Sequence, residues 1–74
     1  GPVRVLMENG AVPDGFVEIA LVRARGEGNR ANLPDVMDSL QDEARSVGGN
    51  AVVRTRIDQG SGSVSAIGTA GIIR

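Results

Sequence analysis

The pattern of apolar and polar positions divides the chain into four predicted strands and one helix. A short β-branched segment from Val3 to Met7 predicts a strand, and turn residues between Glu8 and Gly15 separate it from the next apolar segment. From Phe16 to Arg25, apolar residues occupy both alternating sets of positions. A strand that is apolar on both faces is typical of a covered, central position, so we expect this strand in the middle of the sheet.

A helix is predicted between Leu33 and Val47. Asn32 can cap its first turn, where Pro34 is also well tolerated. Apolar residues recur at spacings of three and four and predict one buried stripe: Leu33, Val36, Met37, Leu40, Ala44 and Val47. The polar, glycine-rich segment from Gly26 to Asn32 is predicted to be a mobile loop before this helix.

The last third of the chain predicts a hairpin. Ala51 to Asp58 and Ser63 to Ile73 alternate as strands do, and Gln59 to Gly62 supply a turn. Strict alternation places four residues of the first strand on one face: Val52, Arg54, Arg56 and Asp58. Gly68 and Gly71 lie inside the second strand, where glycine indicates a bulge, a bend or a closely approaching backbone. We therefore predict an α+β fold: one two-layer β-β-α-β-β domain over residues 1–74, with one helix packed on a mainly antiparallel four-stranded sheet.

The composition removes most catalytic chemistry from consideration. The 74 residues include no cysteine and no histidine, so the chain lacks a thiol nucleophile, an imidazole acid or base, and soft metal ligands. We expect neither an enzyme nor a cofactor nor a metal site. The net charge of −1 and the single aromatic residue give no reason to expect nucleic acid as a partner. No apolar run approaches the ~20 residues of a membrane span, so we expect no direct membrane insertion by this segment.

Charged side chains on two predicted strands are the candidates for binding a ligand or a partner. These residues are Arg23, Arg25, Arg54, Arg56 and Asp58. All eight basic residues are arginines, which bind carboxylates and phosphates well, but composition drift is the favoured explanation. Surface or intersubunit ion pairs are favoured here over ligand recognition. Three acids of the predicted helix, Asp35, Asp38 and Asp42, favour a solvated face over a weak cation site.

The junction between helix and third strand has a structural explanation. Gly48 and Gly49 let the chain turn out of the helix, and the Asn50 side chain can hydrogen-bond its own backbone in the turn. The residues that follow, A-V-V, begin a buried strand.

These residues also carry a resemblance. The stretch D-E-A-R-S-V-G-G-N-A-V-V-R-T-R-I-D, followed by S-A-I-G-T-A-G-I-I, resembles the YbjQ-like family of small bacterial proteins, and V-E-I-A-L-V-R-A matches that family's second strand except at Ala20. The RcsF-like envelope lipoproteins share the architecture and a similar junction. The resemblance implies a two-layer domain and a ring-shaped homo-oligomer, often of five copies. The family's heavy-metal-binding label does not carry over, because this chain has no Cys or His.

Three functions follow as expectations. The first is a non-catalytic oligomerisation or protein-interaction domain, because a chain this small without disulfides gains stability by associating with another copy. The second is an RcsF-like envelope domain that binds another protein. Gly1-Pro2 resembles a tag remnant, so the natural protein can have a signal upstream of it. With such a signal we expect the envelope as the location, and without it the cytoplasm. The third, and least favoured, is a small domain that binds an anionic ligand.

Overall fold

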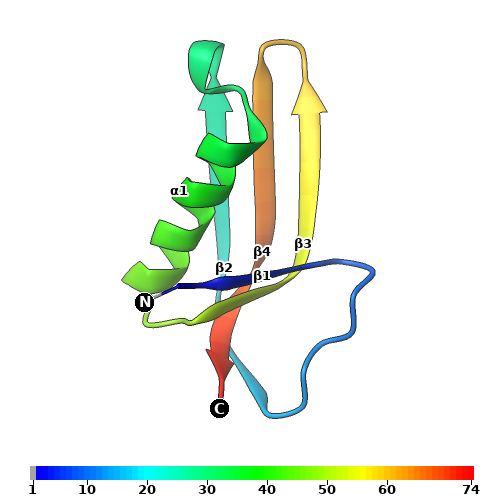
Figure 1. The fold of residues 1–74 in the computed structure, drawn as a ribbon, viewed down its shortest axis with the longest axis vertical. Coiled ribbons are helices and arrows are strands. Elements are labelled where there is room, and N and C mark those ends of the chain that lie inside the picture. Colours follow the sequence, from blue (N-terminus) through cyan, green and yellow to red (C-terminus); the bar gives the residue numbers. More distant parts are fainter. Residues whose placement is uncertain (1) are drawn as a thin grey trace.

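The computed structural model describes residues 2–74 and has an α+β fold with one helix and a four-stranded mixed sheet (Figure 1). The strands are β1 (Arg4–Met7), β2 (Phe16–Glu27), β3 (Ala51–Gly60) and β4 (Ser63–Ile73); a short 3-10 helix η1 (Gly28–Arg30) precedes helix α1 (Leu33–Ser46). The strand order is β1-β3-β4-β2, with β1 parallel to β3 and the other two pairings antiparallel. We call the end of the sheet at the β3–β4 turn the upper end and the opposite end the lower end.

Helix α1 begins and ends at the predicted signals. The Asn32 side chain accepts a hydrogen bond from the Asp35 backbone N–H at 3.0 Å, which satisfies a donor of the first turn. At the other end Gly48 has a φ of +86°, and the Gly49 N–H donates to the Ala44 carbonyl at 2.8 Å. Residues other than glycine rarely adopt a φ of this sign, so the glycine fixes the end of the helix.

The core lies between α1 and one face of the sheet. Val36, Leu40 and Ala44 of the helix are buried against apolar residues of three strands. The strand residues of this cluster are Val22, Ala24, Val52, Val64, Ala66 and Ala70. Leu33 and Val47 do not join them: they are 43% and 37% exposed, so the predicted stripe is wrong at both ends. These two residues lie in the first turn and at the C-cap of α1.

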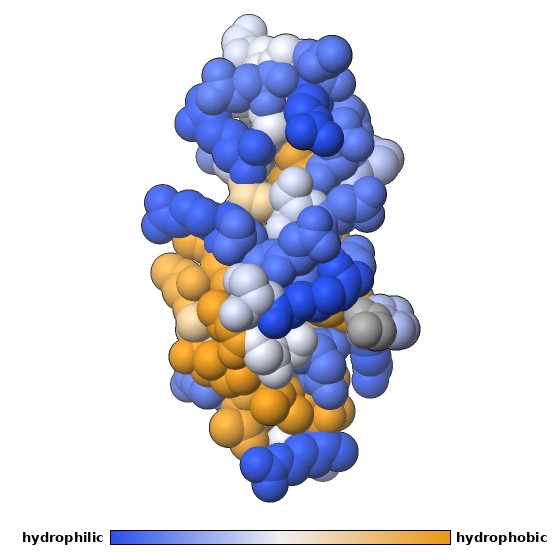
Figure 2. Space-filling view, turned by 90° about the vertical axis from the view of Figure 1, so that its left-hand side faces the viewer, coloured by the Kyte–Doolittle hydropathy of each residue, from blue (hydrophilic) through white to orange (hydrophobic). Residues whose placement is uncertain are grey.

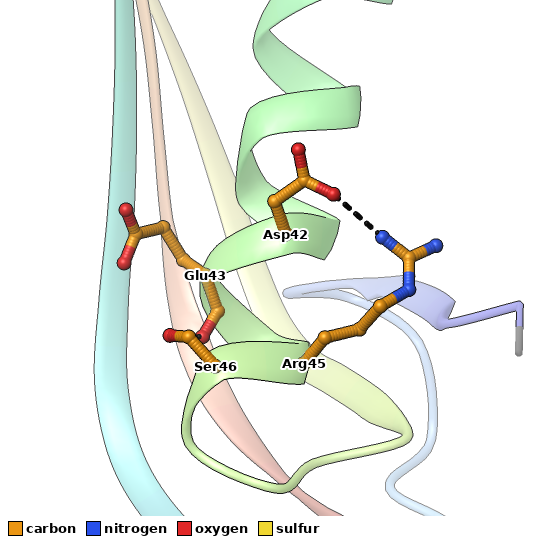
Figure 3. Close-up of polar contacts among 4 residues, drawn as sticks. All are labelled: Asp42, Glu43, Arg45 and Ser46. Carbon is orange, nitrogen blue, oxygen red and sulfur yellow. Dashed lines mark hydrogen bonds and ion pairs between the residues drawn. The ribbon is translucent and has the colours of Figure 1, made fainter.

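Two acidic side chains of α1, those of Asp35 and Asp42, have polar partners in the chain. Asp42 accepts a hydrogen bond from Arg45 at 2.7 Å, and the Ser46 hydroxyl donates to the Glu43 carbonyl at 2.7 Å. Figure 3 shows Glu43 extending to the opposite side of the helix from the Asp42–Arg45 pair. Asp35 accepts from the Asn32 side chain at 2.9 Å. Among residues 2–74, no group of acidic side chains has the arrangement of a metal site.

A bulge in β3 overturns the predicted alternation of that strand. The register with β4 shifts between Val53 and Arg56, and Arg54 has a φ of +54°. Figure 1 shows β3 bending between its first residues, which lie between β1 and β4, and its remainder beside β4. Val52 therefore joins the core, whereas Arg56 points to the other face of the sheet. Gly68 lies opposite the bulge, where an added Cβ would be 2.5 Å from Val52 Cγ1, so the predicted need for glycine is confirmed.

Close backbone packing characterises the lower end of the sheet. A Cβ added to Gly71 would lie 2.2 Å from the Val17 carbonyl oxygen and 2.6 Å from the ring of Phe16. The Asn50 side chain spans the same region: it donates to the Ile73 carbonyl at 3.0 Å and accepts from the Ile73 N–H at 2.8 Å. Asn50 is thus structural, as predicted, but its partner is the end of β4 and not its own turn.

Strand β2 lies at the edge of the sheet, so its predicted central position is wrong. It pairs only with β4, and its register shifts between Glu18 and Ala20. The helix covers one face alone, which leaves much of the apolar first half of β2 exposed. The predicted loop from Gly26 to Asn32 is also partly ordered structure: β2 continues to Glu27 and η1 follows. Gly26 is buried, and an added Cβ would lie 2.0 Å from the Arg30 carbonyl oxygen.

Candidate functional site

A groove crosses three strands near the upper end of the sheet. It has a volume of about 470 Å³ and is lined by successive residues of β2, β3 and β4. The register sets its side chains in two levels. At one level, Ile67 of β4 pairs with Arg23 of β2 and with Arg56 of β3. At the next level, Ser65 pairs with Arg25 and Asp58 in the same way. We call these the Ile67 level and the Ser65 level.

The groove lies on the face of the sheet that α1 does not cover. Ala24 and Ala66 belong to the core under the helix, and Ile57 packs against it. Because successive residues of a strand point to opposite faces, their neighbours Arg23, Ser65 and Asp58 point away from α1. Neighbouring strands are about 4.8 Å apart, so the Cα atoms of residues flanking β4 at one level are separated by roughly 10 Å. Ile67 and Ser65 therefore form the floor, and the charged residues form the walls.

Two of the arginines already have acidic neighbours in this chain. Arg25 Nε is 3.3 Å from a Glu27 carboxylate oxygen, and Arg56 Nε is 3.3 Å from a Glu8 carboxylate oxygen. All four side chains are at least 60% exposed, and such pairs contribute about 0–1 kcal/mol each. Each contact also uses a single guanidinium nitrogen, which leaves the remaining N–H groups of that arginine available.

Arg23 and Asp58 differ from the other charged residues of the groove. Within residues 2–74, neither side chain forms an ion pair or a hydrogen bond. They stand on opposite walls and at different levels, Arg23 at the Ile67 level and Asp58 at the Ser65 level. The groove thus presents one available positive and one available negative charge on a diagonal.

The structure brings four of the five predicted candidates together and separates the fifth. Arg23, Arg25, Arg56 and Asp58 line the groove, whereas Arg54 is not among its lining residues. Arg54 occupies the bulge, where β3 departs from simple alternation. Since β2 and β3 are not neighbours but flank β4, the arginines meet across a third strand and not side by side.

The sequence analysis missed the floor of the groove and both acidic partners. Ser65 and Ile67 alternate with the core residues of β4, and this pattern could have placed them on the open face. Nothing in the local sequence connects Glu8, in the turn after β1, with Arg56. Guanidinium groups carry five N–H donors and no acceptor, so this set of residues is suited to binding charged groups.

A second surface of different character lies on β2. Val17, Ile19 and Leu21 are 50%, 44% and 65% exposed, and β2 has no strand on its outer side. The register shift between Glu18 and Ala20 puts Val17, paired with Ile72, on the helix side of the sheet, whereas Leu21, paired with Thr69, lies on the open side. We call Val17, Ile19 and Leu21, which border the exposed edge on both faces, the β2 apolar row. Figure 2 shows hydrophobic surface gathered toward the lower part of this side of the molecule and hydrophilic surface above it. An exposed apolar cluster beside unpaired strand backbone is typical of a surface that pairs with another chain.

No protein-family model matches this chain, and no curated protein sequence matches it. In the part of the chain that the structure describes, no helix is long and apolar enough to cross a membrane.

Proposed function

We propose that this chain is a non-catalytic interaction domain of YbjQ-like type, which associates with copies of itself through the β2 apolar row. The observation that supports the proposal is the exposure of Val17, Ile19 and Leu21 on an edge strand with free backbone groups. Burying large apolar side chains contributes about 25 cal/mol per Å² of surface removed from water. Pairing of the β2 edge adds main-chain hydrogen bonds, which also fix the orientation of the partner.

The size of the domain makes association favourable. Its accessible surface is 4668 Å², and a specific interface of ordinary size buries about 800 Å² on each partner, which is roughly one sixth of that surface. In such an assembly the exposed apolar side chains at the lower end of β2, in the two-layer β-β-α-β-β domain, gain the covering that the single helix does not supply. A closed ring is the form we propose, with five copies as the number that the YbjQ-like resemblance implies. A ring requires head-to-tail contacts, so the β2 apolar row of each copy meets a different surface of the next copy.

Sedimentation velocity and native mass spectrometry test this proposal between about 1 and 100 μM protein. We expect the unmodified chain to form a discrete oligomer and the L21E variant to be monomeric, because a charged side chain at the interface centre is costly to bury. L33E is the matched control, since Leu33 is also exposed, at 43%, but lies on α1. It should leave the oligomer intact.

Two outcomes contradict self-association through β2. One is a chain that remains monomeric at 100 μM while its cooperative unfolding shows a stable fold. The other is an oligomer that L33E disrupts as strongly as L21E does. A monomer that binds a different protein through the same row would instead favour the alternative function, an RcsF-like envelope domain.

A further inference from the structure

The charge balance of the groove restricts the ligands that it can attract. Three guanidinium groups, from Arg23, Arg25 and Arg56, lie at its walls. Three carboxylates oppose them: Asp58 in the groove, and Glu27 and Glu8 at 3.3 Å from two of the arginines. The site as a whole is neutral, so a simple anion gains no net long-range attraction. A neutral molecule that carries both charges matches it better.

The two charges without partners define where such a molecule binds. Arg23 and Asp58 are one level apart along the strands, a distance of about 7 Å for two residues, and stand on walls roughly 10 Å apart. A ligand that lies diagonally between them meets the floor at Ile67 and Ser65. Ile67 offers apolar contact at the Arg23 end, and the Ser65 hydroxyl can donate or accept near Asp58.

We propose that this groove binds a small zwitterion of about dipeptide size, with its carboxylate at Arg23 and its ammonium group at Asp58. Arg56, at the Ile67 level opposite Arg23, adds a second donor to the carboxylate. A volume of about 470 Å³ is within the ~300–1,000 Å³ typical of ligand sites. This site is separate from the β2 apolar row and goes beyond the proposed self-association.

Three related compounds test the two ends of the ligand separately. Glycyl-leucine carries both charges, N-acetyl-glycyl-leucine lacks the ammonium group, and glycyl-leucine amide lacks the carboxylate. Binding is measured from NMR shifts of the Ser65 and Ile67 amides during titration to about 50 mM. We expect saturation with glycyl-leucine and at least tenfold weaker binding of each blocked compound, because each loses one hydrogen bond to a charged group.

Variants of the protein assign each end to its residue. The affinity of R23Q for glycyl-leucine should be at least tenfold lower than that of the unmodified chain. R23Q should bind glycyl-leucine amide at least as tightly as it binds glycyl-leucine. D58N should likewise bind glycyl-leucine at least tenfold more weakly, and should bind the N-acetylated compound at least as tightly as glycyl-leucine. R30Q and D38N are the matched controls, since both residues are exposed and lie outside the groove, and they should bind like the unmodified chain. Unchanged amide spectra elsewhere in R23Q and D58N verify that each variant is folded.

Several results would overturn the zwitterion site. Absence of saturable shifts at Ser65 and Ile67 is one. Equal binding of the free and blocked compounds is another, and tighter binding of the acetylated compound would indicate an anion site instead. Equal weakening by R23Q and R30Q would indicate nonspecific charge effects. The oligomeric state of L21E is measured independently of ligand binding. A failure to bind glycyl-leucine therefore leaves the proposed self-association unaffected, and a monomeric chain leaves the proposed zwitterion site unaffected.

Discussion

The two halves of β2 have different surroundings although they belong to one strand. From Phe16 to Leu21 the strand is mostly apolar, with its side chains half exposed, and its backbone is packed tightly against Gly71. From Val22 to Glu27 it alternates strictly: Val22, Ala24 and Gly26 are buried, and the residues between them are charged and exposed. The register shift between Glu18 and Ala20 lies within the first half.

This difference separates what holds the fold from what is available for binding. In the upper half, one face is used for the core and the other for charges, so each residue has a single role. In the lower half, apolar side chains exceed what one helix can cover, while the backbone has no spare room. Substitutions in the tightly packed backbone at the lower end should therefore affect stability, and substitutions of the exposed charged residues at the upper end should affect it little.

Of the three changes that follow, G71A is expected to have the largest effect. The new Cβ would lie 2.2 Å from the Val17 carbonyl oxygen, and backbone cannot move aside as a flexible side chain can. We expect a loss of about 3 kcal/mol in the free energy of unfolding, the upper range for overpacking, measured by urea denaturation. G60A is the matched control at the upper end, where the nearest atom is the Ser63 hydroxyl at 3.3 Å. Equal losses in the two variants would remove the contrast between the ends.

An intermediate effect is expected at the bulge, which lies between the two regions of β3. Arg54 has a φ of +54°, a conformation that costs residues other than glycine about 1–2 kcal/mol. R54G should therefore be more stable than R54A by about 1 kcal/mol. Both variants lack the arginine side chain, but only glycine relieves the backbone strain, so R54A is the control for loss of the side chain. Thermal and urea unfolding of the two variants make the comparison. If R54A equals or exceeds R54G, the bulge does not require this backbone conformation.

The smallest effect is expected for E27Q at the upper end. The Arg25–Glu27 contact is 3.3 Å long, and its side chains are 63% and 72% exposed. Exposed pairs of this kind contribute little, so we expect the free energy of unfolding to change by less than about 0.5 kcal/mol. In about 1 M salt E27Q should not change the free energy of unfolding at all, because salt at that concentration screens the ion pair in the unmodified chain. A loss above about 1 kcal/mol would show that the charged wall supports the fold.

Local signals in the sequence were sufficient for most of the elements. Asn32 marked the start of α1 and Gly48 its end, since each satisfies or frees specific backbone groups. The position of β2 could not be predicted in the same way. A strand that is apolar on both faces is compatible with a central position and with an edge whose second covering comes from outside the chain, and the pattern alone favours the commoner case.

Which residues form the candidate site depends on the pairing register of the strands. Side-chain alternation predicts which residues share a face only where a strand has no bulge. Strict alternation along β3 predicts Val52 and Arg56 on the same face of the sheet. In the structure the bulge at Arg54 places them on opposite faces. Gly68 indicated some irregularity in β4, but not that its cause lay in the strand beside it. The meeting of Arg23 with Arg56 across Ile67 follows from strand order, a long-range property.

The paired hydrogen bonds between Asn50 and Ile73 have a kinetic consequence. The last residues of a terminal strand ordinarily fray, and their amides exchange rapidly with solvent. Here the Ile73 N–H is held at 2.8 Å by a side chain from the segment that follows α1, 23 residues earlier in the chain. Release of the Ile73 amide to solvent therefore requires that junction to open, so hydrogen exchange at the end of β4 reports the opening of the helix–strand junction.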